Sequence, residues 1–436
     1  MKIVLVSTYE LGHQPFGLAS PKAWLVRAGH DVTAVDLTKT PLSFDLIHRA
    51  DAVAFSLPMH TATRLAIPWV ERVKRFNPRA KIACYGLYAP LNAELLKEAG
   101  ADAVLGGEFE QALVDWASGA KAPEISLDKL QFLTPDRGGL ENSYAQLREA
   151  GGSKAVAYTE ASRGCKHLCR HCPVVPVYQG QFRVIQRDVV MEDLRQQIAA
   201  GARHVTFGDP DFLNGPTHAM RIVEALHAEF PEVTYDATIK IEHILKHRDL
   251  LRRFKETGCL FIVSAVESLD DAVLAKLEKG HTRDEFFEAV ALTREAGLSL
   301  QPTFLAFTPW TTRESYQELL RVLGDLSLVE SVASVQLALR LLITSNSRLL
   351  ELKDIRAVAG PFDKKLLVHP WTHADPEVDA LGARVFRLVD RLQKEGRNRT
   401  EIFESIWNEA GNDPLPENFR VMPRIAEPYL DEPWYC

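Results

Sequence analysis

The chain has 436 residues, of which 46% are hydrophobic and 25% charged, and its formal net charge is −7 at pH 7. A chain of this length exceeds one hydrophobic core and predicts two or three domains. The acidic balance argues against nucleic acid or an anionic membrane surface as the main partner, and no apolar run reaches the length of a membrane span.

Residues 1–120 alternate short apolar runs with amphipathic segments. We predict strands at 2–7, 31–36, 51–57, 81–85 and 102–105, with helices at 18–29, 62–76 and 91–99. This alternation predicts an α/β domain of the flavodoxin or Rossmann type, whose ligands lie at the carboxyl ends of its parallel strands. The first predicted strand follows Met1-Lys2 at once, so no signal peptide is expected, and six cysteines favour a reducing, cytoplasmic compartment.

The loops after these strands hold small and polar residues that are candidates for ligand contacts. They are Glu10, Gly12, His13, Ser56, His60, Thr61, Gly86, Gly107 and Glu108. Glycines at one edge of a sheet allow a large planar ligand to approach the backbone closely. A flavin, a nucleotide or a corrinoid would each satisfy this pattern.

Residues 121–152 are rich in chain breakers, including Pro123, Pro135 and the pair Gly138-Gly139. Breakers so closely spaced predict a linker between domains. From residue 153 the alternation resumes, with strand-like runs at 155–159, 203–207, 233–238, 260–266, 299–305 and 332–338. Helical segments separate them at 188–200, 217–229, 243–257, 270–278, 283–296 and 313–325. Six such units predict a partial (β/α)6 TIM barrel over residues 153–345.

A cluster of cysteines lies directly after the first strand of this second domain. Cys165, Cys169 and Cys172 have the spacing C-x3-C-x2-C in a loop opened by Gly164 and bounded by Pro173. Three thiolates on one loop suit a soft metal centre, either an iron–sulfur cluster or zinc. His167 or His171 could complete a zinc site.

The cysteine spacing resembles that of the radical S-adenosylmethionine (SAM) family, in which three cysteines hold a [4Fe–4S] cluster whose fourth iron binds SAM. A flavodoxin-like domain directly before it is similar to the cobalamin-binding half of cobalamin-dependent members, and Gly107-Glu108-Phe109-Glu110 resembles their G-E-x-E stretch. The resemblance implies cobalamin at the loop residues named above. The D-x-H-x-x-G signature that supplies a lower cobalt ligand elsewhere is absent, so we expect a cobalt without protein nitrogen, with His13 as the alternative ligand.

The same resemblance implies which residues contact SAM at the strand ends. Residues 207–212 resemble an F-x-D-x-x-F motif, so Gly208, Asp209 and Asp211 are expected near the methionine ammonium, although either aspartate could only cap a turn. Glu267 and Ser268 are expected at the ribose, and Thr303 beside adenosine or substrate. Arg340 is expected to meet a carboxylate of SAM or substrate, with a structural salt bridge as the alternative.

Residues 346–436 are rich in proline and contain one predicted helix, 376–394. We interpret them as an extension that covers the open side of the barrel. The tail, with Ala426-Glu427-Pro428 and Cys436, resembles radical SAM proteins whose tails end in Cys-Cys-Ala-Glu-Pro or Cys-selenocysteine-Ala-Glu-Pro.

The resemblance implies a cobalamin-dependent radical SAM enzyme that reductively cleaves SAM and methylates an unactivated carbon or phosphorus centre of a small molecule. A reductase, flavodoxin or ferredoxin would donate the electron; neither nucleic acid nor membrane is expected as a partner. One alternative is a radical SAM enzyme without a functional corrinoid, doing a rearrangement or transferring another part of SAM such as the aminocarboxypropyl group. The other is a non-catalytic zinc or redox module.

Overall fold

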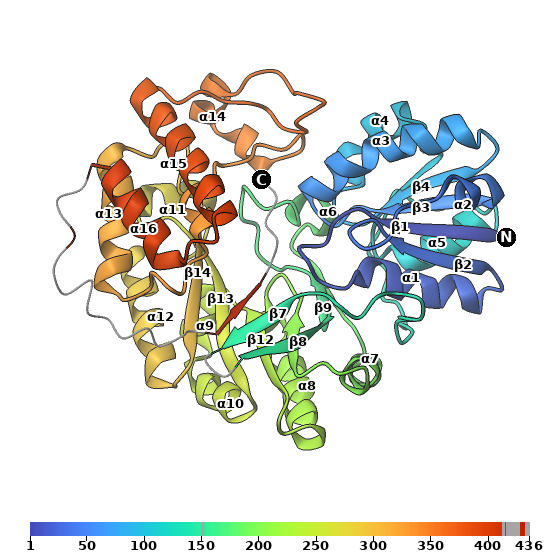
Figure 1. Ribbon diagram of the computed structural model, residues 1–436, viewed down its shortest axis with the longest axis horizontal. Helices are drawn as coiled ribbons and strands as arrows, with labels where there is room; N and C mark the ends of the chain where they lie inside the picture. The colour runs from blue at the N-terminus through green and yellow to red at the C-terminus, as the bar shows by residue number, and fades with distance from the viewer. Residues whose placement is uncertain (150–151, 412–414, 416–427, 432–436) are drawn as a thin grey trace.

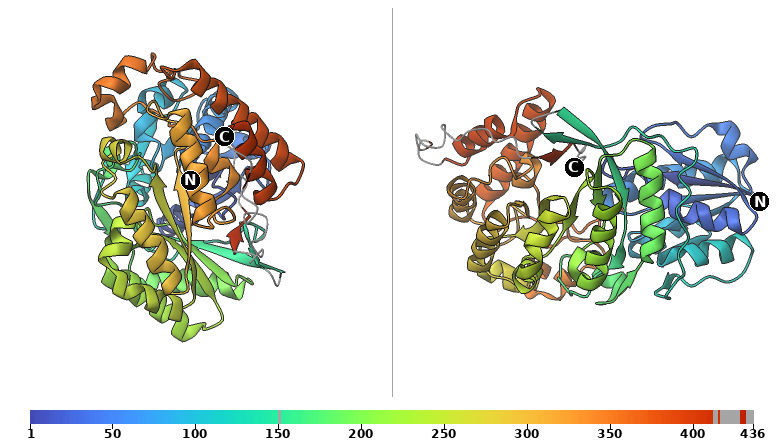
Figure 2. Two further views of the ribbon diagram at one scale, coloured as in Figure 1. Left: turned by 90° about the vertical axis from the view of Figure 1, so that its left-hand side faces the viewer. Right: turned by 90° about the horizontal axis from the view of Figure 1, so that it is seen from below.

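The computed structural model describes residues 1–149, 152–411, 415 and 428–431. Two α/β lobes lie side by side, the N-terminal sheet in one and the larger sheet with the C-terminal helices in the other (Figure 1, Figure 2). Within this described part of the chain, no helix combines the length and the apolar character needed to cross a bilayer. The tail residues Ala426, Glu427 and Cys436 lie outside the described residues.

The N-terminal lobe is a parallel sheet of strand order β2-β1-β3-β4-β5-β6. Its strands are β1 (Lys2–Ser7), β2 (Asp31–Asp36), β3 (Ala52–Ser56), β4 (Lys81–Tyr85), β5 (Ala103–Gly107) and β6 (Ile125–Ser126). Its helices are α1 (Phe16–Arg27), α2 (Phe44–Arg49), α3 (His60–Phe76), α4 (Ala93–Glu98) and α5 (Phe109–Ala117). The order of the first five strands is that of flavodoxin-like sheets, which confirms the predicted fold.

Alternating side chains of this sheet bury its two faces in separate cores. Val4 and Val6 of β1 pack with α2, α3 and α4, whereas Ile3 and Leu5 pack with α1 and α5. Because both faces are covered, the strands read as continuous apolar runs. Ligands of such sheets bind at the carboxyl ends of the strands.

The second lobe is built on a sheet of order β14-β13-β12-β11-β8-β7-β15. Five parallel strands form its curled half-barrel: β8 (Gly152–Thr159), β11 (His204–Phe207), β12 (Thr234–Thr238), β13 (Cys259–Glu267) and β14 (Ser299–Phe304). The antiparallel strands β7 (Gln146–Glu149) and β15 (Tyr429–Leu430) extend its first edge. The larger sheet thus begins inside the predicted linker.

Helices alternate with the parallel strands as predicted. They are α7 (Arg187–Ala199), α8 (Pro216–Glu229), α9 (Ile241–Lys246), α10 (Leu251–Glu256), α11 (Asp271–Leu277), α12 (Arg283–Glu295) and α13 (Arg313–Asp325). The single helix predicted at 243–257 is wrong, because the chain leaves helical geometry at His247, where φ is −117°.

The sixth strand predicted at 332–338 is also wrong. Ser334–Leu337 form a 3-10 turn, and a short apolar run fits such a buried turn as well as a strand. The Gln336 side-chain oxygen accepts a hydrogen bond from the Phe304 amide, 3.3 Å away, and so occupies the edge of β14 that a sixth strand would need. The half-barrel therefore ends at β14, apart from one isolated bridge between Phe307 and Arg340.

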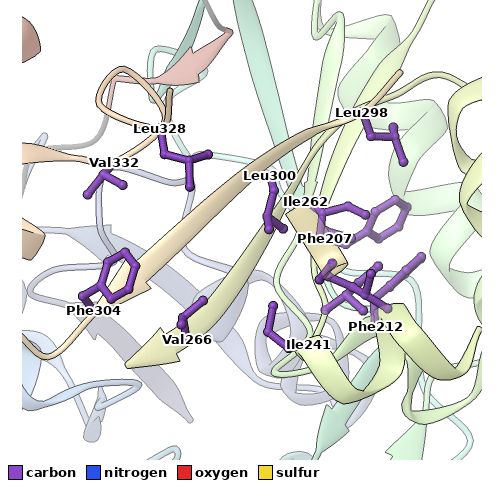
Figure 3. Packing of buried hydrophobic residues seen from close by; sticks show 14 of the residues in the cluster. Phe207, Phe212, Ile241, Ile262, Val266, Leu298, Leu300, Phe304, Leu328 and Val332 are labelled. Atoms are coloured by element: carbon purple, nitrogen blue, oxygen red, sulfur yellow. The ribbon is translucent and has the colours of Figure 1, made fainter. Parts of the chain in front are cut away.

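The C-terminal extension completes the wall of the barrel at this edge. Helices α15 (Pro376–Lys394) and α16 (Arg399–Glu409) bury Val385, Ile406 and neighbouring apolar residues in the same core as the barrel strands. Figure 3 shows that core between Phe207, Phe304 and Val332. These helices thus form part of the barrel's own core.

Candidate functional site

The cysteine loop leaves the barrel after β9 (Ser162–Gly164), which pairs with β10 (Phe182–Val184). Gly164 has a φ of +73°, and a β-carbon there would collide with the Tyr178 ring and the Gln181 carbonyl. The position therefore requires glycine. This turn sends the chain directly into Cys165.

The three thiols of this loop lie close enough to affect one another electrostatically. Burial, with smaller contributions from Cys169 and Cys165, raises the pKa of Cys172 to about 12. Burial and Cys169 also raise the pKa of Cys165. The Lys279 ammonium is the nearby cation: burial lowers its pKa, but Glu267, Cys169 and Cys172 raise it by more. Three converging thiols beside a buried cation fit a group that binds thiolates, such as an iron–sulfur cluster.

Charged contacts fasten the loop to the barrel. The His167 and His243 rings both face Asp211, with nitrogen–oxygen distances of 3.5 and 2.6 Å. The His171 ring lies 3.1 Å from a Glu267 oxygen, and the Lys279 ammonium lies 3.3 Å from the same oxygen. Both histidines that could have joined a zinc site thus contact carboxylates.

The ligand atoms of Cys165, His167 and Asp211 lie within 4.8 Å of one another, so this set could also hold a metal ion. Zinc there would use one of the three clustered cysteines and leave two thiols without a role. Asp211 is also engaged already. Burial alone would raise its pKa, but His167 and His243 lower it to about 2, and its other oxygen caps the turn at Leu213.

Glu267 contacts the cysteine loop through His171, and its own backbone is strained. Its φ is +71°, which costs a non-glycine residue about 1–2 kcal/mol. Burial alone would raise its pKa, but Lys279 and His171 lower it to about 2. A charged pair in this setting stabilises the loop only while the carboxyl is ionised.

We predict that Glu267→Gln lowers the free energy of unfolding by roughly 2 kcal/mol at pH 7, because a charged hydrogen bond to Lys279 is lost. Since the folded-state pKa lies below the ordinary 4.5, the stabilisation is complete above about pH 4.5 and is lost as the pH falls toward 2. Anaerobic thermal melts between pH 7 and pH 3 measure this. The difference from wild type should shrink over that range, whereas Glu192→Gln, at an exposed ion pair, should stay within about 0.5 kcal/mol of wild type. A difference that does not change with pH would contradict the prediction.

A first cavity of about 260 Å³ lies inside the half-barrel. Its polar wall comes from inward-facing strand residues, Thr206, Asp236, Gln301 and Thr303, and its apolar wall includes Phe261 and Val263. Asp236 and Thr206 are register partners on β12 and β11, and the Thr206 hydroxyl donates to Asp236 over 2.7 Å. The polar strand ends suit a polar small molecule such as SAM.

A second cavity of about 200 Å³ lies along the carboxyl edge of the N-terminal sheet. Gly17, Ser56, Gly86 and Gly107 line it on one side. The other side belongs to the cysteine-loop region, with Arg163, Val174 and Tyr178. Its glycines and its place at the strand ends fit a large planar cofactor such as a corrinoid.

The two cavities adjoin. Glu10, Met59, Tyr158 and Gly208 line both of them. A β-carbon on Gly208 would collide with the Tyr158 hydroxyl, so glycine lets the Tyr158 ring lie against this strand end. Molecules bound in the two cavities would therefore face each other across these residues.

A buried guanidinium joins the two lobes beside the second cavity. Arg163 donates to Glu110 over 2.7 and 2.9 Å and to Glu160 over 2.6 Å, and it lies 3.5 Å from Glu108. Burial would lower the pKa of Arg163, but Glu110, Glu160 and Glu108 raise it. The Gly-Glu-Phe-Glu stretch thus fastens the N-terminal lobe to the residue two positions before Cys165.

The predicted cobalamin residues divide between several places. Glu10, Ser56, Gly86 and Gly107 line the second cavity, whereas His13 lines the first, with its ring 4.9 Å from that of Tyr158. Neither cavity is lined by the remaining four, Gly12, His60, Thr61 and Glu108. Of these, Glu108 accepts from the Tyr178 hydroxyl over 3.0 Å and His60 contacts the Leu366 carbonyl.

The predicted SAM residues divide as well. Gly208, Asp209 and Thr303 line the first cavity, whereas Glu267 and Ser268 line a separate depression outside it. Asp209 accepts from the Ala161 amide and the Ser162 hydroxyl, so its two oxygens cap a turn, and burial raises its pKa to about 7. Arg340 reaches neither cavity and pairs with Asp379 over 2.7 Å, which is the structural alternative.

Sequence reasoning missed Tyr158, Thr206, Asp236 and Arg163 as site residues. Thr206 and Asp236 could have been found, because each is a polar residue in the interior of a predicted barrel strand, where alternate side chains face inward. Arg163 gave no such signal, because its partners Glu108 and Glu110 are more than fifty positions away.

Two family models match the chain: the B12 binding domain over residues 2–117 and the Radical SAM superfamily over residues 159–323. The hopanoid C-3 methylase of Methylococcus capsulatus is 26% identical over 330 residues, covering 70% of this chain and 63% of that protein. The anaerobic magnesium-protoporphyrin IX monomethyl ester cyclase of a Synechocystis species is 24% identical over 326 residues, covering 68% and 64%. The chain thus spans less than two thirds of the length of these relatives.

Solved structures show the same fold. The cobalamin-dependent S-adenosylmethionine radical enzyme OxsB, with aqua-cobalamin and SAM bound, matches with a TM-score of 0.66 at 14% identity, covering 90% of this chain and 67% of that one. The radical SAM methyltransferase TsrM from Kitasatospora setae matches with a TM-score of 0.58 at 15% identity, covering 75% and 73%.

Proposed function

Since the chain belongs to the radical SAM superfamily and carries a B12-binding domain before its radical SAM domain, we propose that it is a cobalamin-dependent methyltransferase. Cys165, Cys169 and Cys172 hold a [4Fe–4S] cluster, the first cavity holds SAM and substrate, and the second holds cobalamin. The substrate is a small molecule methylated at an unactivated carbon or phosphorus centre. The name of the hopanoid C-3 methylase supports methyl transfer as the reaction.

The observation that carries this proposal is the continuity of the two cavities through Glu10, Met59, Tyr158 and Gly208. A methyltransferase that uses both cofactors needs their reacting ends on either side of one substrate. Separate cavities in the two lobes would not provide that arrangement.

When bound, the cluster supplies an electron for SAM cleavage and the corrinoid supplies a cobalt centre able to carry a methyl group. The protein's own residues position these groups and exclude water. Lys279, Glu267 and His171 fix the cysteine loop, and Arg163 fixes the lobe interface. The Pro428 carbonyl accepts from the Gln301 side chain over 2.7 Å, and Leu430 lines the first cavity, so the last described strand closes the barrel end.

Glu267, Ser268, Asp211 and Arg340 lie outside the first cavity, which favours positioning roles for them rather than SAM contact. Gly208 and Thr303 remain our proposed SAM neighbours, and Asp209 supports the turn beside them. The chemistry also needs an electron donor, which we propose to be a reductase, flavodoxin or ferredoxin in a reducing cytoplasm.

The products formed from SAM test the proposal, and the substrate need not be known. Anaerobically reconstituted protein with cobalamin, reductant and SAM should release S-adenosylhomocysteine, since the methyl group leaves SAM, besides 5′-deoxyadenosine. Chromatography of the nucleosides measures both. The protein without cobalamin should lose only the S-adenosylhomocysteine.

Two other product patterns would contradict methyl transfer. 5′-Methylthioadenosine would indicate transfer of the aminocarboxypropyl group, and 5′-deoxyadenosine alone, unchanged by cobalamin, would indicate a corrinoid-free enzyme. Zinc in place of iron after reconstitution would indicate the non-catalytic module.

A further inference from the structure

Glu10 is a buried carboxyl at the junction of the two cavities. Its side chain lines both cavities, only 8% of the residue is exposed, and its Oε2 atom has no hydrogen-bond partner. A buried polar atom left without a partner costs about 1–3 kcal/mol unless a ligand satisfies it. The unpartnered Oε2 atom therefore indicates that a bound molecule hydrogen-bonds to Glu10.

One edge of the second cavity lies beside this carboxyl. A β-carbon on Gly17 would lie 4.0 Å from Oε1, so the Gly17 main chain lies beside this carboxyl. Gly17 and Ser56 form the adjoining edge of the N-terminal sheet. A ligand at that edge meets Glu10 directly.

The surroundings of Glu10 favour a neutral carboxyl. The charged groups that act on it are Glu160, Asp36 and Arg137, and the other titratable residues of the two cavity linings are His13, Asp209, Asp236, Arg399, Arg163, Tyr158 and Tyr178. Arg137 already donates to Asp193 over 2.6 and 2.8 Å, and Arg163 already pairs with Glu110 and Glu160. Burial and Glu160 raise the pKa of Glu10 to about 8.

A protonated carboxyl presents a donor and an acceptor side by side. That pair is the complement of a primary carboxamide, whose carbonyl accepts and whose NH2 group donates. Cobalamin carries several primary carboxamides on the rim of its corrin ring. An ionised carboxylate could only accept, and it would also carry a second charge beside Glu160.

We propose that Glu10 binds the corrinoid by pairing its neutral carboxyl with a side-chain carboxamide. This inference rests on the proposed function, because it requires a corrinoid in the second cavity. Adenine of SAM also offers an adjacent donor and acceptor, and it would reach Glu10 from the first cavity. If Glu10 binds a corrinoid carboxamide, its loss should weaken the binding of cobalamin. If it binds adenine, its loss should weaken the binding of SAM.

Equilibrium dialysis with cyanocobalamin, whose cyanide ligand does not titrate in this range, tests the proposal at pH 6.5 and pH 9. Wild type should bind about tenfold more weakly at pH 9, because most Glu10 has then lost its proton. Glu10→Gln keeps a donor and an acceptor, so it should match wild type at pH 6.5 and show no weakening at pH 9. Glu10→Ala should bind about tenfold more weakly at both pH values.

Glu71→Gln, an exposed change on α3, is the matched control and should behave as wild type. Thermal melts of every variant show whether each is folded, and the wild-type pH dependence tests the proposal without any substitution. Wild-type affinity for cyanocobalamin in Glu10→Ala, or a loss of SAM affinity instead, would overturn the role of Glu10 while leaving the proposed function intact. Failure of wild type to bind cobalamin at all would overturn both.

Discussion

Alanine in place of Cys165, Cys169 or Cys172 is expected to abolish iron binding and with it the reductive cleavage of SAM. A [4Fe–4S] cluster of this kind rests on three thiolates, so each loss removes a ligand that the loop cannot replace. Wild type should load about four irons per chain on anaerobic reconstitution, and each variant close to none. Iron analysis and 5′-deoxyadenosine formation measure the two losses.

Two other cysteines serve as matched controls. Cys84 lies in β4 and Cys259 in β13, and both are fully buried outside the cysteine loop. Their alanine variants should lose about 1–2 kcal/mol of stability through cavities and keep all their iron. A full cluster in Cys169→Ala would rule out the proposed ligand set.

Arg163→Met should strongly lower the free energy of unfolding. The change leaves the buried Glu108 and Glu110, and the partly exposed Glu160, without their shared cation. Breaking a buried pair in this way costs about 3–5 kcal/mol. Since the same guanidinium joins the lobes, cobalamin affinity should fall as well. Urea unfolding and cyanocobalamin dialysis measure the two effects.

The exposed Arg195 is the matched control. It pairs with Glu192 and Glu229 on the surface, so Arg195→Met should cost no more than about 1 kcal/mol. Adding Glu110→Gln to Arg163→Met should recover part of the loss, because one unpaired buried charge is removed. Equal effects of Arg163→Met and Arg195→Met would show that the buried network does not hold the lobes together.

Local sequence patterns predicted most of the fold. The alternation of residues such as Ile3 and Val4 between two cores follows from the period of a strand. The apolar runs predicted five of the six parallel strands of the N-terminal lobe, all but β6, and all five parallel strands of the second lobe. The strand predicted at 332–338 was wrong because the apolar spacing of this run suits a turn and a strand equally. Only the side chain of Gln336, on the edge of β14, decides between them.

The candidate site was predicted where it is contiguous in sequence, as in the cysteine loop. It was missed where it depends on contacts between lobes. Glu108 and Glu110 lie more than fifty positions from Arg163, and Asp379 lies 39 positions from Arg340, so the local sequence does not predict these pairs. Asp209 and Asp211 were placed at the correct strand end, but the turn at Ala161 and the rings of His167 and His243 take up their oxygens.

Gly164 and Val174, on either side of the cysteine loop, line the second cavity, so a cluster on that loop and cobalamin in that cavity should lie close together. Electron paramagnetic resonance of the reduced protein tests this most directly. Protein reconstituted with iron, sulfide and cobalamin should show a cob(II)alamin signal that relaxes faster when the [4Fe–4S] cluster is also reduced and paramagnetic. The enhancement should be absent in Cys169→Ala, which keeps the cobalamin cavity and lacks the cluster. A cobalt signal whose relaxation is the same with and without the reduced cluster would contradict the account.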